Sequence, residues 1–263
     1  MVERVTDNPW RSLRRFTDAR IGIGRAGVSL PTAELLAFQM AHAQARDAVH
    51  QPLDVARLTA DLGRIDGALP ALTVQSKAAD RADYLRHPDK GRRLAAGTTL
   101  LSDAPDLAIV IADGLSSRAV QDHAPAMLSA LIAQMRGVRL SAPIIAVQGR
   151  VAIGDDIAAA MNAAAVLVLI GERPGLSSPD SLGLYFTQNP GPGLSDARRN
   201  CISNVRPAGL LPDHAAARFA YLYAQAQVLG TSGVALKDNS APLDGLAQNA
   251  ATSFLSLPAG HNR

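Results

Sequence analysis

The sequence has few cysteines and few aromatic residues, and each shortage excludes a class of protein. Cys201 is the only cysteine among 263 residues, so the chain can form neither an internal disulfide nor a metal site built from several cysteines. A reducing compartment is therefore expected. Aromatic residues make up 4% of the chain. Because nucleic-acid binding usually needs a concentrated basic face with stacking aromatics, we expect no nucleic-acid partner.

Long apolar runs are missing as well. Residues 1–15 carry charges throughout, without the apolar core of a signal peptide, and no later run has the length of a membrane span. We therefore expect a soluble, cytoplasmic protein with no membrane partner. Hydrophobic residues make up 48% of the chain, enough for a substantial core. The arginines near the N-terminus predict a solvated or partner-facing surface; they are Arg11, Arg14, Arg15, Arg20 and Arg25.

Residues 1–104 are polar and predict helices. Pro31 and Thr32 begin a segment that predicts a helix ending near His50, and Asp54 is placed to cap the next helix. Residues 80–101 are rich in charges, and Pro88 is expected at the start of a further helix. This stretch predicts either an exposed helical layer or a docking surface for another chain.

Residues 105–237 have a different pattern. Short, continuous apolar runs at 107–112, 143–147 and 166–170 are typical of strands buried on both faces. Helical stripes lie between them: one has Pro125 in its first turn, and the next is capped by Asp155. This alternation predicts an α/β fold, a Rossmann-like, doubly wound, mostly parallel sheet preceded by the N-terminal helical region. A strand at 182–186 and a helix from Asp213 to Gly230 follow, and residues 238–263 are predicted to be a disordered tail.

Three loops follow the predicted strands, and each offers polar side chains beside glycine. They are 113–117, 149–151 and 171–175. Ligands of open α/β sheets bind beyond the carboxyl ends of the strands, so these loops are either a binding site or ordinary turns with surface ion pairs. Glu172 and Arg173 directly follow an apolar run, which places both at the rim of the sheet.

The usual catalytic motifs are not found. Residues 22–27 match the glycine pattern of dinucleotide-binding loops but lack the preceding strand and the following helix, so we interpret them as a glycine-rich turn. The histidines do not fall at metal-ligand spacing, and no phosphate-binding loop or nucleophile elbow occurs. Cys201 has no recognisable catalytic partner and is expected as a small buried hydrophobe. Such a chain is more typical of holding a cofactor than of performing chemistry alone.

Several sequence blocks together resemble the small subunit of ethanolamine ammonia-lyase. The most specific pair is the Gly-Glu-Arg-Pro-Gly-Leu block at 171–176 followed by Cys-Ile-Ser-Asn at 201–204. Asp-Gly-Leu-Ser at 113–116 and Gly-Arg-Val at 149–151 precede them in the family order. Gly-Arg-Ala-Gly at 24–27 and the stretch 86–94 are similar to the N-terminal half of the family. The resemblance extends from about Asn8 to Val234.

The resemblance implies a subunit of a heteromeric ammonia-lyase. A large subunit, a TIM barrel, would hold ethanolamine and the catalytic side chains, so no catalytic residue is expected in this chain. Residues 1–104 would dock to the large subunit. Residues 105–237 would form the cobalamin-binding domain and close over adenosylcobalamin from the other side, with Val151, Glu172 and Cys201 as cofactor contacts. We add Arg150, Asp113 and Ser116, from the same rim loops, as candidate cofactor-binding residues.

The implied reaction converts ethanolamine to acetaldehyde and ammonia through homolysis of the cobalt–carbon bond, hydrogen abstraction and amine migration. The chain has no Asp-x-His-x-x-Gly motif, so cobalamin is expected to keep its own dimethylbenzimidazole ligand, the base-on form. Relatives from bacterial microcompartments tend to have a longer N-terminal extension, which makes encapsulation less expected. Two alternatives stay open: a stand-alone nucleotide-dependent oxidoreductase, and a non-enzymatic assembly subunit.

Overall fold

The computed structural model describes residues 5–100 and 102–240. The predicted disordered tail therefore lies outside the described residues from 241 onward. The helices are α1 (Thr32–His50), α2 (Val55–Leu62), α3 (Arg81–Arg86), α4 (Ser117–Gln134), α5 (Ile153–Met161) and α6 (Pro212–Leu229), with short 3₁₀ helices at Pro9–Phe16, Lys90–Arg92, Asp196–Arg198 and Gly233–Ala235. Among the described residues, no helix has both the length and the apolarity needed to cross a membrane.

One six-stranded mixed sheet forms the centre of the molecule. Its strands are β1 (Leu72–Gln75), β2 (Ala108–Ala112), β3 (Ile144–Val147), β4 (Ala165–Gly171), β5 (Leu182–Gln188) and β6 (Arg199–Val205), in the order β1-β3-β2-β4-β5-β6. The four strands β1 to β4 pair in parallel, whereas β5 is antiparallel to both β4 and β6. The predicted α/β class is confirmed, but the doubly wound Rossmann-like arrangement is not. Residues 172–181 contain no crossover helix, so the chain turns back alongside β4 in the opposite direction.

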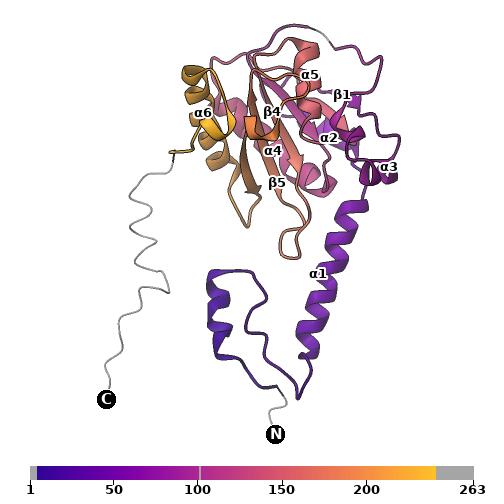
Figure 1. The fold of residues 1–263 in the computed structure, drawn as a ribbon, viewed down its shortest axis with the longest axis vertical. Coiled ribbons are helices and arrows are strands. Elements are labelled where there is room, and N and C mark those ends of the chain that lie inside the picture. Colours follow the sequence, from indigo (N-terminus) through magenta and orange to yellow (C-terminus); the bar gives the residue numbers. More distant parts are fainter. Residues whose placement is uncertain (1–4, 101, 241–263) are drawn as a thin grey trace.

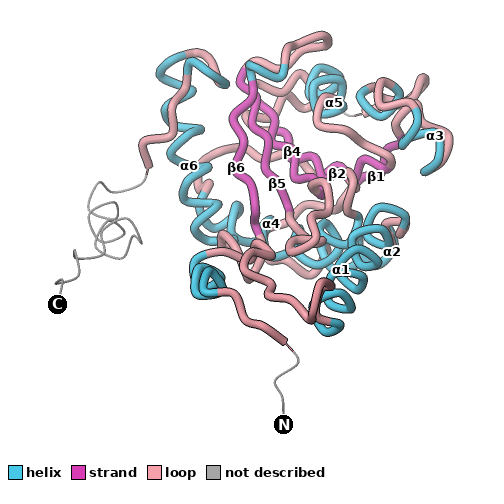
Figure 2. The backbone as a smooth tube through the Cα atoms, turned by 60° about the horizontal axis from the view of Figure 1, so that its bottom comes forward, coloured by secondary structure: helices cyan, strands magenta, loops and turns pink. Residues whose placement is uncertain are grey.

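The two faces of the sheet pack against different helices (Figures 1 and 2). Ile109 and Ile111 of β2 belong to the core under α2, α4 and α6. The alternate residue Val110 belongs to a second core that includes residues of α5. Every residue of β2 and β4 is buried, which is why these strands have continuous apolar sequences instead of alternating ones.

The strands at the two edges of the sheet differ from the sequence prediction. β1 lies within the region that we predicted to be helical, and β6 was not predicted. β1 has two exposed residues among four, and β6 contains arginine, two asparagines and a serine. Edge strands are only partly buried, so they lack the apolar run by which the central strands are recognised.

Helix boundaries confirm some predicted caps and correct others. Asp54 caps α2 through its carboxylate, which accepts a hydrogen bond from Arg57 N at 3.0 Å. The predicted ends of α1 and α6 are also confirmed. Pro125, however, lies inside α4 and not in its first turn. The helix is capped by Ser116 and begins at Ser117, eight residues before Pro125. Pro88 begins no helix and lies between α3 and the following 3₁₀ helix.

The expected cap of α5 is also wrong. The helix begins at Ile153, and Asp155 lies inside its first turn instead of preceding it. The carboxylate of Asp155 does not cap the helix because it forms a buried ion pair with Arg199 of β6, with two N···O distances of 2.9 and 2.7 Å. Asp155 therefore joins α5 to the edge of the sheet.

Candidate functional site

Two adjoining cavities lie beyond the carboxyl ends of β3 and β4. The larger, 470 Å³, is lined by residues of the loops after β2, β3 and β4, including Glu172. The smaller, 320 Å³, includes Cys201 of β6. Arg150, Val151 and Tyr185 line both cavities. The structure thus brings together four of the six predicted site residues, which come from three separate segments of the chain.

Asp113, a fifth predicted residue, lines neither cavity. Its carboxylate accepts hydrogen bonds from Gln148 N at 3.0 Å and from Gly149 N at 2.9 Å, and Arg81 lies 3.6 Å away. Asp113 therefore fixes the loop after β3 against the end of β2. Arg150 directly follows Gly149 in this loop, so the same hydrogen bonds help to hold Arg150 in the cavity wall.

Ser116, the sixth predicted residue, is also occupied by local contacts. Its hydroxyl accepts a hydrogen bond from Ala119 N at 3.2 Å and donates one to Pro179 O at 2.8 Å. The first bond caps α4, and the second ties the loop after β4 to that helix. Ser116 thus supports the loop that carries Glu172, and it lines neither cavity.

The buried position of Asp113 predicts a pH dependence of stability. Asp113 is 2% exposed, and burial raises its pKa from 3.8 to about 6, against the effects of Arg81 and the two backbone donors. The protonated form is thus favoured more in the folded chain than in the unfolded chain. Stability is expected to fall as pH rises between these two pKa values, by about 3 kcal/mol in total, and to change no further through this group at higher pH.

The comparison is between the wild type and Asp113→Asn, which removes the titration. Urea unfolding of both proteins across this pH range gives the difference in their unfolding free energies. The unfolding free energy of the wild type minus that of Asp113→Asn should fall as pH rises from acid to neutral, because only the wild type loses stability through this group. A difference that is constant with pH would contradict the raised pKa.

Glu172 occupies the rim position that the sequence predicted. Its Oε2 accepts a hydrogen bond from Ser181 Oγ at 2.5 Å, and its backbone N–H donates to Ser181 O at 2.9 Å. The other oxygen, Oε1, lies beside Gly183, where a β-carbon would come within 2.7 Å of it. Glycine at 183 therefore leaves the space that the Glu172 side chain needs. Oε1 accepts no hydrogen bond from another described residue.

Arg150 is held against the ring of Tyr84. The guanidinium carbon lies 4.4 Å from the ring centroid, and Arg150 Nη2 donates to Tyr84 O at 3.3 Å. Tyr84 is fully buried and donates its hydroxyl hydrogen to Gly149 O at 3.2 Å; burial raises its pKa to about 12, so it stays a donor. Arg150 Nε is buried and has no hydrogen-bond partner among the residues that the structure describes. A buried donor without an acceptor is costly, and such a group at a cavity wall is typical of a site that a ligand completes.

Cys201 is exposed, which corrects our expectation of a buried residue. It lies opposite Tyr185 in the pairing of β5 with β6. Crowding by protein atoms raises the pKa of the thiol, the Tyr185 hydrogen bond opposes this, and Glu172 raises the pKa further. The thiol is therefore neutral at physiological pH and serves as a packing or weak hydrogen-bonding group, not as a thiolate nucleophile.

Several residues that line the cavities were missed from the sequence, among them two tyrosines and an arginine. Tyr185 lines both cavities, Arg199 lines the smaller one, and Tyr84 lines the larger. Burial raises the pKa of Tyr185, so its phenol is neutral and able to donate. None of the three belongs to a motif. One signal was available for Tyr185, because it lies in the stretch 182–186 that we predicted as a strand. The sequence did not indicate that this strand pairs with the one that carries Cys201.

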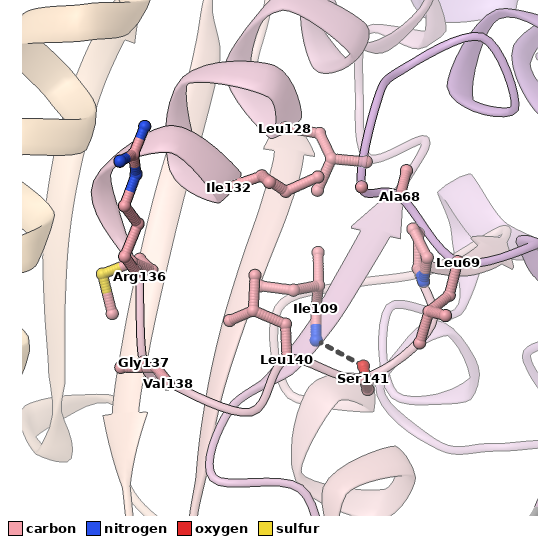
Figure 3. Close-up of a pocket in the computed structure, with 13 residues that line it drawn as sticks. Ala68, Leu69, Ile109, Leu128, Ile132, Arg136, Gly137, Val138, Leu140 and Ser141 are labelled. Carbon is pink, nitrogen blue, oxygen red and sulfur yellow. Dashed lines mark hydrogen bonds between the residues drawn. The ribbon is translucent and has the colours of Figure 1, made fainter.

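A separate cavity of 260 Å³ lies at the opposite ends of the strands, near the amino ends of β2 and β3. Figure 3 shows Leu128, Ile132 and Ile109 around it, with the hydrogen bond from Ile109 N to Ser141 Oγ, which measures 3.0 Å. None of the predicted site residues lines this cavity. Within the described part of the chain, no group of three or more His, Cys, Asp or Glu side chains could hold a metal ion.

Comparisons with known proteins point to one family. The model of the ethanolamine ammonia-lyase light chain matches residues 7–237. A protein of Azotobacter vinelandii, named ethanolamine ammonia-lyase small subunit, is 54% identical over 253 residues, which is 92% of this chain and 93% of the relative. Proteins with the same name from Ralstonia nicotianae and Bradyrhizobium diazoefficiens are 53% and 49% identical and cover 89% and 90% of this chain, with 90% and 93% of their own lengths aligned.

Proposed function

The chain belongs to the ethanolamine ammonia-lyase small-subunit family, and on that premise we propose that it holds adenosylcobalamin at an interface with a large catalytic subunit. The name of the relatives supports a lyase that is built from a small and a large subunit. The observation that carries the cofactor assignment is the convergence of Arg150, Val151, Glu172 and Cys201 on two adjoining cavities at one edge of the sheet.

The chemistry of these residues fits the edge of a corrin ring. That edge carries amide groups, which both donate and accept hydrogen bonds, between apolar methyl and methylene groups. Glu172 Oε1 is an acceptor without a partner among the described residues, and Arg150 Nε is a buried donor without one. Val151, which lines both cavities, supplies an apolar surface. The cavities, 470 and 320 Å³, are open and smaller than the whole cofactor, which supports a site completed by a second chain.

Each residue of the proposed site then has a role in holding the cofactor. Glu172 accepts hydrogen bonds from amide or hydroxyl groups, and Arg150 donates to amide oxygens. Tyr84 and Asp113 keep Arg150 in place, the first by stacking and the second by fixing the loop at Gly149. Val151 and Cys201 exclude water from the apolar parts of the ligand.

Adenosylcobalamin, when bound, supplies homolysis of its cobalt–carbon bond, which starts the radical conversion of ethanolamine to acetaldehyde and ammonia. Radical reactions must be shielded from water and stray hydrogen donors, and the wall formed by this chain provides that shield on one side. No histidine of the described residues lines either cavity, so this chain would offer no imidazole to the cobalt there, and base-on binding stays our prediction. Ethanolamine itself is held mainly by the large subunit.

The two alternatives have less support. The glycine-rich residues 22–27, on which a nucleotide-dependent oxidoreductase would depend, lie before α1 and contribute no strand to the sheet. An assembly subunit without a cofactor role gives no reason for Glu172, Arg150 and Cys201 to line adjoining cavities.

Glu172→Gln is expected to weaken cobalamin binding by about 10- to 100-fold, because a hydrogen bond to a charged acceptor is replaced by one to a neutral amide. The measurement is titration of the assembled two-subunit complex with a cobalamin, followed by the change in its visible absorption. Subunit assembly, followed by size-exclusion chromatography, should be unchanged.

Two further variants make the test specific. Val151→Trp should also lower cobalamin affinity, by filling the apolar part of the site. Asp66→Asn removes an exposed carboxylate that lines neither cavity and should bind as the wild type does. If Glu172→Gln and Val151→Trp both left the affinity unchanged in a correctly assembled complex, the assembly-subunit alternative would replace the cofactor assignment.

A further inference from the structure

Residues 5–50, here called the arm, extend away from the sheet (Figure 1). The arm consists of the N-terminal segment and α1. Hydrogen bonds hold the N-terminal segment in one conformation. Thr6 and Arg25 exchange backbone hydrogen bonds of 2.7 and 3.0 Å, and the Arg14 guanidinium donates to Ile21 O at 2.7 Å and to Glu34 Oε1 at 3.0 Å. Gly22 packs so closely on the backbone at Trp10 and Arg11 that a β-carbon would approach it to 2.5 Å. The arm is therefore preformed.

The arm nevertheless has almost no apolar core of its own. The 3₁₀ helix Pro9–Phe16 buries no residue, and α1 buries only Ala41 and Ala48. Nine of the sixteen large hydrophobic residues that are exposed in the described chain lie in the arm. Trp10 is 67% exposed, Leu36 58% and Met40 62%. An ordered element that exposes tryptophan, leucine and methionine together is typical of a protein interface.

The charge of the arm indicates which kind of surface would be complementary to it. Residues 5–31 contain five arginines but only two aspartates. Arg15 and Arg25 have no carboxylate partner among the described residues. An interface with this composition favours a partner with an apolar centre and carboxylates around it.

The arm also touches the loop that carries Glu172. Arg20 Nη2 donates to Leu176 O at 3.5 Å, and that loop lines the larger cavity through Glu172 and Arg173. A partner that covers the arm and extends past Leu176 would therefore reach the cavity. The arm thus contacts the loop that lines the cavity, which is the arrangement that a shared site needs.

We propose that the arm is the main docking element for the large subunit, which it binds through Leu36, Met40 and Trp10 against an apolar surface ringed by carboxylates. This inference rests on the proposed function only in taking the large subunit as the partner. It adds the position of the contact and the chemistry of the opposing surface.

The test is the double variant Leu36→Glu/Met40→Glu. Both side chains are exposed and one helical turn apart, so the fold should survive, with an unchanged circular dichroism spectrum and melting temperature. Association with the purified large subunit, measured by biolayer interferometry, is expected to weaken by about 100-fold, because buried carboxylates would replace two apolar contacts. The matched control is Val228→Glu at the end of α6, which is 82% exposed and outside the arm; it should associate as the wild type does.

Charge reversal tests the second half of the proposal. Arg15→Glu/Arg25→Glu should lower the association rate constant by about 10-fold at low ionic strength, with little effect at high salt. A rate that is unchanged or increased would show that the opposing surface is not acidic.

Three results would overturn the docking assignment. These are association of Leu36→Glu/Met40→Glu at wild-type strength, self-association of the isolated chain that this variant abolishes, and binding of the wild type to anionic lipid vesicles that this variant abolishes. The second would identify another copy of this chain as the occupant, and the third a membrane surface. Each of them is compatible with loss of cobalamin from Glu172→Gln, so the docking proposal can fail while the cofactor assignment stands.

Discussion

Gly171→Ala is expected to abolish folding or to lower the free energy of unfolding by about 4 kcal/mol or more. A β-carbon at this position would lie 1.9 Å from Ser116 O and 2.7 Å from Asp113 O. Both oxygens belong to the backbone, so no side chain can rotate away. The loop after β2 crosses directly over the end of β4 here, with Leu115 N donating to Gly171 O at 2.9 Å.

Relief of this clash would require the two neighbouring strands to move apart. β2 and β4 pair over five residues, from Ala108 with Val166 to Ala112 with Ile170, and each strand is buried along its whole length. The strands cannot separate without exposing the core, which is why the expected cost exceeds that of an ordinary glycine substitution. The variant should appear mainly in the insoluble fraction, and any soluble protein should unfold at much lower urea concentration.

Gly175→Ala is the matched control for this effect. It lies in the same loop, and the nearest atoms to its added β-carbon would be 3.9 Å away, at ordinary contact distance. Its stability should stay close to that of the wild type. If Gly171→Ala and Gly175→Ala were equally stable, the close crossing of β4 by the loop after β2 would be wrong.

Asp155→Ala is expected to destabilise the chain by about 3–5 kcal/mol, because it leaves the Arg199 guanidinium buried without its main partner. The two side chains are 2% and 3% exposed, and the pair has two parallel N···O contacts of 2.9 and 2.7 Å. Arg199 would retain Thr187 Oγ1 at 3.0 Å and the carboxylate of Asp196, also at 3.0 Å. Asp196 is 73% exposed, so its attraction is weakened by water and cannot replace Asp155.

Urea unfolding again measures this effect, and two comparisons isolate its cause. Asp122→Ala removes one member of an exposed pair with Arg118, whose side chains are 41% and 46% exposed, and should change stability by less than about 1 kcal/mol. Asp155→Leu/Arg199→Met removes both buried charges and should recover most of the lost stability. A double variant as unstable as Asp155→Ala would mean that packing, not the unpaired charge, sets the cost.

The same substitution bears on the proposed cofactor site. Arg199 lines the smaller cavity and begins β6, the strand that carries Cys201. Asp155 holds that strand against α5, which directly follows the loop of Arg150 and Val151. The buried ion pair therefore sets the relative position of two walls of the site, although neither residue was a candidate from the sequence.

Side chains that directly follow the central strands could be placed at the rim of the sheet from the sequence pattern. On the edge strand β6, by contrast, Cys201 was a candidate only through the family resemblance and Arg199 was missed. Arg150, Val151 and Glu172 follow buried apolar runs, so their place at one rim of a parallel sheet follows from strand direction alone. Asp113 and Ser116 satisfy the same rule but face the backbone of neighbouring loops, at Gly149 and Pro179. Whether a rim side chain faces a cavity or a loop depends on hydrogen bonds that sequence position does not encode.

The sequence by itself determined the α/β class, the three central strands, the ends of α1 and α6, and the family, because burial on both faces and helix termini leave local signals of hydrophobicity and capping. Only the tertiary structure decided the antiparallel return of β5, the pairing of Tyr185 with Cys201, the Asp155–Arg199 ion pair and the exposure of the arm. Each of these depends on contacts between residues distant in the chain, and such contacts have no periodicity from which they could be inferred.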